Sequence, residues 1–198
     1  INDSNTDSAR WFTDVLKSYF EVSETNELNS KLSDVFFQSK QYNYFFKLPD
    51  EFHKKKPFLY GEKNTTVTYA QLSSLVKARH SVRWYSNKTV DSTIINECIS
   101  LSSQAPSACN RQPFKYIVLS EKDKASTVAS LAMGTVGFSQ NIQNLIVVVG
   151  DLSAYPFERD RHVIYIDASL SSMLLMLALK SKSIDSCPIN WPDIESRE

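Results

Sequence analysis

The chain has 198 residues, of which 42% are hydrophobic and 22% are charged, and its formal net charge at pH 7 is +0. This balance is typical of a globular protein, and the lack of net charge gives no electrostatic reason to expect binding to nucleic acid or to an anionic membrane. The cysteine count is odd and there is no C-x-x-C pair, so neither a disulfide framework nor a metal site is expected.

No signal peptide opens the sequence, and no apolar run approaches the ~18 residues that a membrane span needs. We therefore expect a cytoplasmic protein that does not contact a membrane. The chain starts with Ile1 rather than methionine, and we expect it to be a piece of a longer protein.

Residues 1–66 are polar and aromatic, and they are expected to form a helical extension. Its apolar residues recur at helical spacing in two stretches, and the second stretch predicts a helix from Glu27 to Gln38. The first stripe consists of Trp11, Val15, Leu16, Tyr19 and Phe20. The extension would pack on the rest of the chain or on a partner subunit, because no motif indicates a separate binding function.

Residues 67–198 alternate between predicted helices and strands. Thr68 and Asp91 are placed to cap two helices at their N-termini. A strand over 115–119, a helix over 121–131 and a second strand over 145–149 follow. The second strand is an unbroken apolar run, which is typical of a central strand covered on both faces.

The last predicted helix opens at Asp167 and is apolar almost all round. A helix of this kind is buried on more than one side. Such a helix could lie at the two-fold axis of a dimer, and the alternative is a core helix of a monomer.

Two polar segments carry the candidate site, and the first is Arg79-His80-Ser81-Val82-Arg83. If the preceding helix continued, the two arginines would share one face. Guanidinium groups bind phosphate in a bidentate manner and keep their charge. The alternative is an ordinary basic helix end, since arginine complements the helix dipole there.

The second segment runs from Pro106 to Pro113. Proline fixes its own backbone and pushes the residue before it out of helix, so a rigid turn that presents polar side chains is expected. An ordinary connection between a helix and a strand is the alternative.

Glycine is scarce, with residues only at positions 61, 134, 137 and 150. The chain therefore has no G-x-G-x-x-G, no P-loop and no G-x-S-x-G nucleophile elbow. Any nucleotide phosphate must be held mainly by side chains, which the arginine-rich segment could supply.

The order of the two segments, joined by a helix-like stretch from Asp91 to Ser103, resembles the nitroreductase family of FMN-dependent oxidoreductases. There an R-x-S-x-R/K motif and a P-S-x-x-N-x-Q-P turn hold the flavin from opposite subunits. The resemblance implies an α+β fold, with a nitroreductase-like mixed sheet flanked by helices, in a two-fold homodimer with flavin at the interface. Residues 67–198 would be the FMN-binding domain, with its C-terminal part missing.

A third segment, Ser186 to Trp191, matches the family's stretch that crosses the flavin face. As bare sequence it is only a proline-bounded turn. By resemblance a backbone N–H of Ile189 or Asn190 would face the flavin N5 atom, and Arg83 would lie near the pyrimidine. The implied catalytic residues are therefore Arg83, Ile189 and Asn190.

The resemblance also implies which residues bind FMN, with the turn reaching the flavin of the partner subunit. From the three segments in order they are Arg79, His80, Ser81, Arg83, Pro106, Ser107, Ala108, Asn110, Gln112, Pro188, Ile189 and Asn190.

The implied function is transfer of two electrons from NAD(P)H through bound FMN to an oxidised acceptor, such as a nitro compound or a quinone, in ping-pong order. Arg83 would stabilise negative charge on the flavin. No residue stands out as a general acid. His80, His162 and Tyr165 are candidates for that role, and a structural role is the alternative for each. Two other functions stay open: a specialised flavin enzyme (dehydrogenase, dehalogenase or flavin-consuming) and a non-catalytic scaffold that keeps the fold.

Overall fold

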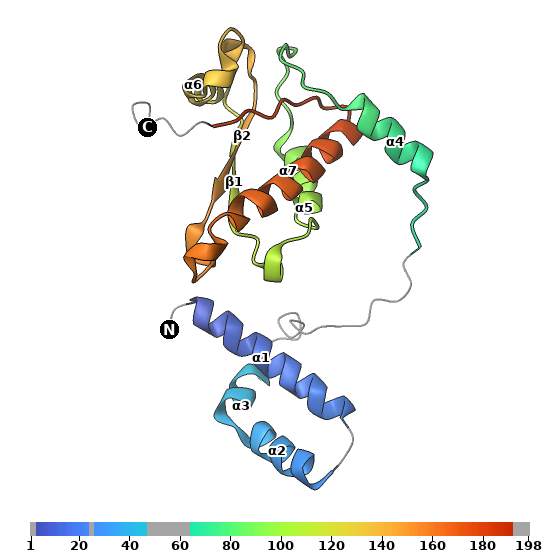
Figure 1. Cartoon of the computed structure of the whole chain (residues 1–198), viewed down its shortest axis with the longest axis vertical. Helices are drawn as coiled ribbons and strands as arrows, with labels where there is room; N and C mark the ends of the chain where they lie inside the picture. The colour runs from blue at the N-terminus through green and yellow to red at the C-terminus, as the bar shows by residue number, and fades with distance from the viewer. Residues whose placement is uncertain (1–2, 24–25, 47–63, 192–198) are drawn as a thin grey trace. The chain divides into compact units, whose positions relative to one another are not determined.

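The computed structural model describes residues 3–23, 26–46 and 64–191, and the chain divides into two compact units, Ile1–Asn64 and Thr65–Glu198 (Figure 1). The predicted helical extension, 1–66, and the predicted FMN-binding domain, 67–198, remain predictions as domains. Part of each lies outside the described residues.

The first unit consists of α1 (Asp3–Val22), α2 (Glu27–Gln38) and α3 (Lys40–Phe46). Aromatic rings join these helices: the ring centroids of Phe20 and Phe36 lie 5.5 Å apart, and those of Phe37 and Tyr42 lie 5.0 Å apart. Such pairs add about 0.5–1.5 kcal/mol beyond the burial of their area. The predicted helix from Glu27 to Gln38 is confirmed.

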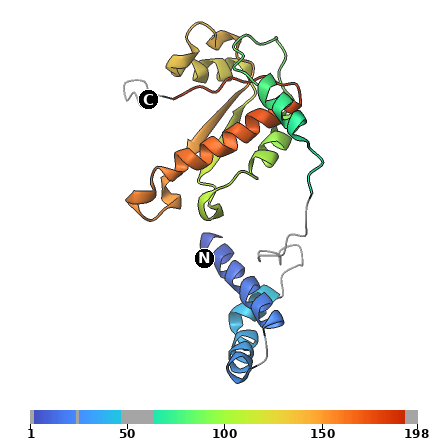
Figure 2. The same cartoon turned by 45° about the vertical axis from the view of Figure 1, so that its right-hand side comes forward.

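The second unit is an antiparallel pair of strands with helices packed on it (Figure 2). β1 (Phe114–Leu119) pairs with β2 (Leu145–Gly150), in a register that sets Phe114 opposite Gly150. α7 (Val163–Ser181) packs on α5 (Ser92–Ser102) and contacts both strands, and α6 (Lys122–Leu131) also contacts both. The predicted α+β class is confirmed. Among the described residues, parallel pairing is limited to a bridge between Ser81 and Ser186, so the sheet is smaller than the predicted mixed sheet.

α4 (Tyr69–Ala78) and α5 both begin at the predicted caps. The Gln71 backbone N–H donates to Thr68 Oγ1 at 3.3 Å and the Thr68 N–H donates to Gln71 Oε1 at 2.8 Å, which completes a capping box. The Thr93 N–H donates to Asp91 Oδ1 at 2.7 Å, and this hydrogen bond lowers the pKa of the Asp91 carboxyl.

Two clusters form the core of the second unit. One lies between α5 and α7, and the other lies beside α6. The first comprises Cys98, Leu175, Ala178 and Leu179, and the second comprises Ala125, Ala129, Phe138 and Ile142. Polar groups between α5, β1 and α7 are paired, since Tyr116 Oη and Ser171 Oγ lie 2.7 Å apart and the Ser171 hydroxyl donates to Ser102 O at 3.0 Å.

Two sequence predictions about this unit are wrong. β2 is not a central strand in the described part of the chain, where it pairs only with β1, and it is not covered on both faces, since the successive residues Val148 and Val149 remain 38% and 41% exposed. α7 begins at Val163 rather than at Asp167, which is buried within the helix. Its entry is a turn of 3₁₀ helix, η6 (Glu158–Asp160).

One stretch of the described chain, Glu158–Ser181, is long and apolar enough to cross a membrane by length and composition. This differs from the expectation that no run approaches that length. The stretch includes α7, which packs against α5 and carries the buried Asp167. One such stretch is weak evidence for a membrane, because core helices of soluble proteins pass the same test of length and composition.

Candidate functional site

The arginine segment, residues 79–83, is extended rather than helical. α4 ends at Ala78, and Arg79 is its C-cap with φ −74° and ψ 123°. Ser81 forms the parallel bridge with Ser186, and the Val82 N–H donates to Ser186 O at 3.2 Å. Arg79 and Arg83 therefore do not share a helical face, because the helix does not continue: pairing with a distant segment replaces its next turn.

This extension changes what the two arginines can reach. Residues four apart are separated by about 13 Å in extended backbone and by about 6 Å in a helix. Arg79 and Arg83 can thus contact two different parts of one ligand. Among the described residues, no hydrogen bond or ion pair engages either guanidinium group.

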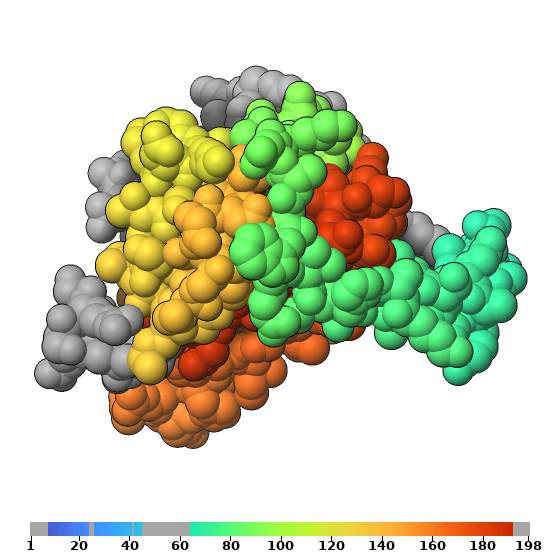
Figure 3. Space-filling view, turned by 90° about the horizontal axis from the view of Figure 1, so that it is seen from above, coloured from blue at the N-terminus to red at the C-terminus, as the bar shows by residue number. Residues whose placement is uncertain are grey.

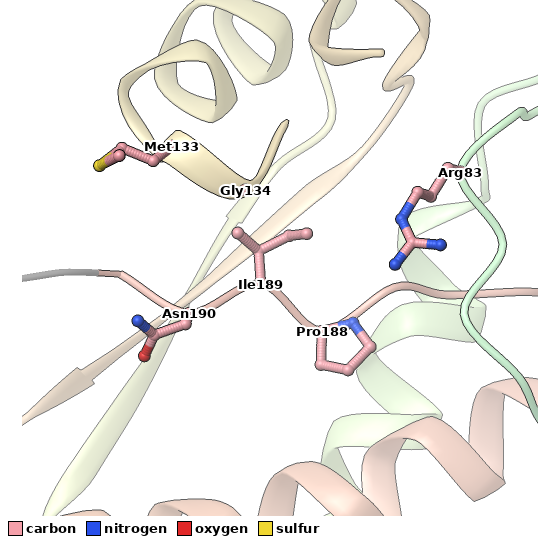
Figure 4. A pocket seen from close by; sticks show the side chains of 6 residues that line it. All are labelled: Arg83, Met133, Gly134, Pro188, Ile189 and Asn190. Atoms are coloured by element: carbon pink, nitrogen blue, oxygen red, sulfur yellow. The ribbon is translucent and has the colours of Figure 1, made fainter. Parts of the chain in front are cut away.

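The bridge brings Arg83 to a pocket of ≈ 410 Å³ that it shares with the C-terminal segment, residues 186–190. The lining residues are Arg83, Met133, Gly134, Pro188, Ile189 and Asn190. Figure 4 shows the guanidinium group of Arg83 reaching toward Pro188, while the side chain of Ile189 points toward Gly134. The structure therefore brings together the three residues predicted to be catalytic, although their roles remain predictions.

The pocket contains backbone hydrogen-bond donors that have no acceptor among the described residues. In the described part of the chain, no group accepts a hydrogen bond from the backbone N–H of Ile189 or Asn190. No lining residue carries a carboxylate. A cation beside free N–H groups suits a ligand that is rich in acceptors and bears negative charge.

The wall opposite Arg83 comes from η3 (Met133–Thr135), which sequence reasoning missed. A Cβ atom at Gly134 would lie 3.2 Å from Ile189 Cγ2, so glycine permits this close approach. The Thr135 hydroxyl fixes the turn by donating to Ala129 O at 2.6 Å. In a chain with so few glycines, the glycine at position 134 could have indicated a close approach of two segments.

The chain from Arg83 to Val90 is fastened to the loop before β2. Asn141 Nδ2 donates to Arg83 O at 3.0 Å, and the Val90 N–H donates to Asn144 Oδ1 at 2.9 Å. Figure 3 shows this green stretch crossing the face between the yellow α6 and the red end of α7. Within it, burial and then the nearby Cys187 and Asp185 raise the pKa of Tyr85 to about 12, while Arg83 opposes the shift.

The proline turn, residues 106–113, contains three non-glycine residues with positive φ: Cys109 at 52°, Asn110 at 52° and Gln112 at 48°. Backbone of this kind costs on the order of 1–3 kcal/mol per residue and persists only where contacts hold it. The side chains of Asn110 and Gln112 brace the turn, since Gln112 Nε2 donates to Asn110 Oδ1 at 3.2 Å and to Ser103 O at 3.3 Å.

The start of the turn is tied to α7. The hydroxyl of Ser107 donates to Asp167 Oδ2 at 2.6 Å, and the Ala108 N–H donates to the same oxygen at 3.1 Å. Pro106 and Ala108 are exposed beside this tie. Asp167 was expected only as the residue that opens the last helix, so its contact with the turn is a second feature that sequence reasoning missed.

The turn and the pocket lie at opposite ends of α7 within one protomer (Figures 1 and 2). Asp167 holds the turn near the start of the helix, whereas Ile184, whose N–H donates to Leu179 O, leads from its end into the C-terminal segment. At 1.5 Å per residue, these two points lie about 20 Å apart along the helix. The structure thus does not bring the predicted residues of the turn to the pocket of the same chain.

The candidate general acids lie away from the pocket lining. His80 Nδ1 lies 3.0 Å from Ala78 O, so that nitrogen is engaged by the end of α4. His162 is the N-cap residue of α7, without a capping hydrogen bond from its side chain, and Tyr165 is exposed on that helix.

Comparison with protein families bears directly on these segments. Residues 76–148 match the model described as the Nitroreductase family. The match includes both the arginine segment and the proline turn, and it ends before the C-terminal segment. The part of the chain that resembles this family is thus residues 76–148.

Individual proteins are similar to this chain over a longer stretch than the family model matches. MhqN of Bacillus subtilis, which is named as an NAD(P)H nitroreductase, is 26% identical over 165 residues, covering 64% of this chain and 79% of its own length. A nitroreductase from Exiguobacterium sibiricum, crystallised with FMN, is 26% identical with a TM-score of 0.54, over 65% of this chain and 79% of that one. A nitroreductase-like protein from Streptococcus mutans has a TM-score of 0.58 at 19% identity, over 65% and 80% of the two chains, and shows likeness of fold alone. The predicted family and the oxidoreductase class are confirmed.

Proposed function

We propose that the chain binds FMN and transfers two electrons from NAD(P)H to an oxidised small molecule, such as a nitro compound or a quinone, in ping-pong order. The observation that carries the proposal is the pocket in which Arg83 meets Pro188, Ile189 and Asn190. The relatives support the cofactor and the donor, because one was crystallised with FMN and another is named for NAD(P)H.

The residues present fit this cofactor. FMN, when bound, supplies the electron chemistry, while the protein supplies binding, orientation and electrostatics. Arg83 would balance negative charge at one end of the ligand, and Arg79, on the same extended segment, would bind the phosphate at the other. The free backbone N–H groups of Ile189 and Asn190 would donate to the flavin ring.

We further propose that each site needs two chains. The pocket and the proline turn lie at opposite ends of α7, so residues of one protomer cannot bind one flavin from both places. A two-fold homodimer would bring the turn of one chain to the pocket of the other. The apolar side chains that α7 exposes, Tyr165, Ile166 and Leu170, would be covered in such an interface.

The proposed setting is a reducing cytoplasm. All three cysteines, Cys98, Cys109 and Cys187, are free. In the same proposal residues 67–198 form the FMN-binding domain.

An absorbance measurement on the whole chain supplied with FMN tests the proposal. Without oxygen, NADH or NADPH should bleach the flavin band at ~450 nm, since the protein tunes the cofactor's own chemistry. A nitroaromatic or a quinone should then restore the band, with parallel lines in double-reciprocal plots. Asn190→Ala should change little and Asn190→Pro much, because only proline removes the backbone N–H.

Two outcomes would redirect the proposal. An FMN-loaded protein that neither nicotinamide reduces would favour a specialised flavin enzyme. A protein that remains colourless after FMN is supplied would favour a scaffold that keeps the fold.

A further inference from the structure

The carboxylate of Asp167 is almost fully buried, with 3% of the residue exposed. Burying a carboxylate is unfavourable unless hydrogen bonds compensate for the lost water. Here the compensation comes from outside α7: the Ser107 hydroxyl donates to Oδ2 at 2.6 Å, the Ala108 N–H at 3.1 Å and the Tyr155 hydroxyl at 3.3 Å. Two of these donors belong to the proline turn.

Ser107 connects Asp167 to the far end of the turn through two hydrogen bonds. Its hydroxyl proton is directed at Asp167, which leaves the oxygen free to accept the Gln112 N–H at 2.8 Å. One carboxylate oxygen therefore fixes Ala108 directly and Gln112 through a single hydroxyl. The two residues flank Cys109 and Asn110, which have positive φ.

The sequence of the turn does not favour this shape by itself. Asparagine adopts positive φ more readily than most residues, but cysteine and glutamine have no such preference. A strained backbone persists only where its surroundings over-determine it. The contacts to Asp167 are such surroundings, and they reach the turn from a residue 60 positions away along the chain.

Tyr155 completes the arrangement. Its hydroxyl lies within reach of both Asp167 Oδ2 and Ala108 O, at 3.3 and 3.4 Å, and the Arg111 guanidinium lies 5.4 Å from the centroid of its ring. Burial, followed by the charge of Asp167, raises the pKa of Tyr155, so this phenol keeps its proton to a higher pH than an ordinary tyrosine.

We propose that Asp167 is a positioning residue for the cofactor, which holds Ser107 and Ala108 of the proline turn in the shape that receives the flavin. The inference rests on the proposed function, because it takes the turn to be part of the FMN site. It adds that the shape of the turn is set by α7, the helix that would also lie at the dimer interface.

The test compares Asp167→Ala and Asp167→Asn with Ser171→Ala in the whole chain. Ser171 is a matched control, because it lies one turn further along α7, is fully buried and makes its hydrogen bonds to Tyr116 and Ser102 rather than to residues 106–113. Amide hydrogen exchange of Ala108 and Gln112 is measured first, in the protein without flavin. FMN affinity and the visible circular dichroism of bound FMN are measured next.

Asp167→Ala should speed exchange at both amides, weaken FMN binding roughly tenfold or more and alter the visible dichroism, since hydrogen bonds to a charged group are lost. Asp167→Asn should give values between those of the wild type and Asp167→Ala in all three measurements, because its amide oxygen can still accept a hydrogen bond but carries no charge. Ser171→Ala should lower the melting temperature without changing these three readouts.

Unchanged exchange and unchanged FMN affinity in Asp167→Ala would overturn the inference. Equal losses of affinity in Ser171→Ala would also overturn it, because the effect would then be general destabilisation. If Asp167→Ala fails to fold, Asp167→Asn decides by the same criteria. A wild-type protein that binds no FMN refutes the proposed function, whereas the exchange measurement still decides whether Asp167 holds the turn.

Discussion

Gly150, the last residue of β2, lies directly against Ile164 in the first turn of α7. A Cβ atom at Gly150 would stand 2.8 Å from Ile164 Cδ1, closer than such atoms approach one another in proteins. The absence of a side chain at residue 150 therefore lets the strand end and the helix meet here without displacing Ile164.

Gly150→Ala should therefore destabilise the protein by about 1–3 kcal/mol, the usual cost of overpacking. Ile164→Val removes the Cδ1 atom and should cost about 0.5–1.5 kcal/mol by itself. The double variant should be more stable than the sum of the two effects predicts, because the closest of the contacts, the one to Cδ1, is removed. Urea unfolding of the four proteins measures this coupling, and strict additivity would contradict the contact.

Replacing either arginine of the extended segment should weaken FMN binding. Hydrogen bonds to charged groups contribute about 1.5–3 kcal/mol each, so Arg79→Ala and Arg83→Ala should each lower the affinity by roughly tenfold or more. Fluorescence titration of FMN measures the effect, and Lys88→Ala, at an exposed position outside the pocket, serves as control. Variants that bind like wild type would remove these arginines from the site.

Tyr85 should make the protein lose stability in alkali. Its pKa is raised from 10.0 to about 12 in the folded chain, so between these values the unfolded state loses a proton that the folded state keeps. The free energy of unfolding should consequently fall as the pH rises through this window. Below pH 10, ionisation of Tyr85 should not make the free energy of unfolding depend on pH. Tyr85→Phe should reduce the slope, whereas Tyr69→Phe, at an exposed residue, should not. Equal slopes in all three proteins would mean that Tyr85 ionises freely.

A charge on the exposed apolar side of α7 should separate the proposed dimer. Leu170→Glu should lower the mass measured by light scattering toward the 22.5 kDa of one chain and reduce FMN affinity in parallel. Ser130→Glu, at an exposed position on α6, should do neither. A flavin-loaded monomer at micromolar concentration would refute the two-chain site.

Sequence reasoning succeeded where the deciding interactions are local. Thr68 and Asp91 cap their helices through residues two or three positions away, and such caps can be recognised in a short window of sequence. The two apolar strands were also predicted correctly.

It failed where distant segments decide the structure. The arginine segment leaves the helix because it pairs with Ser186, and Asp167 serves the proline turn rather than a helix end. An acidic residue within an otherwise apolar helix was nevertheless a signal, since buried carboxylates need partners. What sequence alone could not give is which partners, because they are brought together only by the fold.

The paired strands described above also bear on where the sheet can be extended. β1 and β2 pair with each other and, within the described residues, with no further strand, so each presents a row of backbone donors and acceptors along its outer side. Apolar strands with open edges readily pair with other chains. The outer sides of β1 and β2 are therefore the places in this unit where a further strand can add to the sheet.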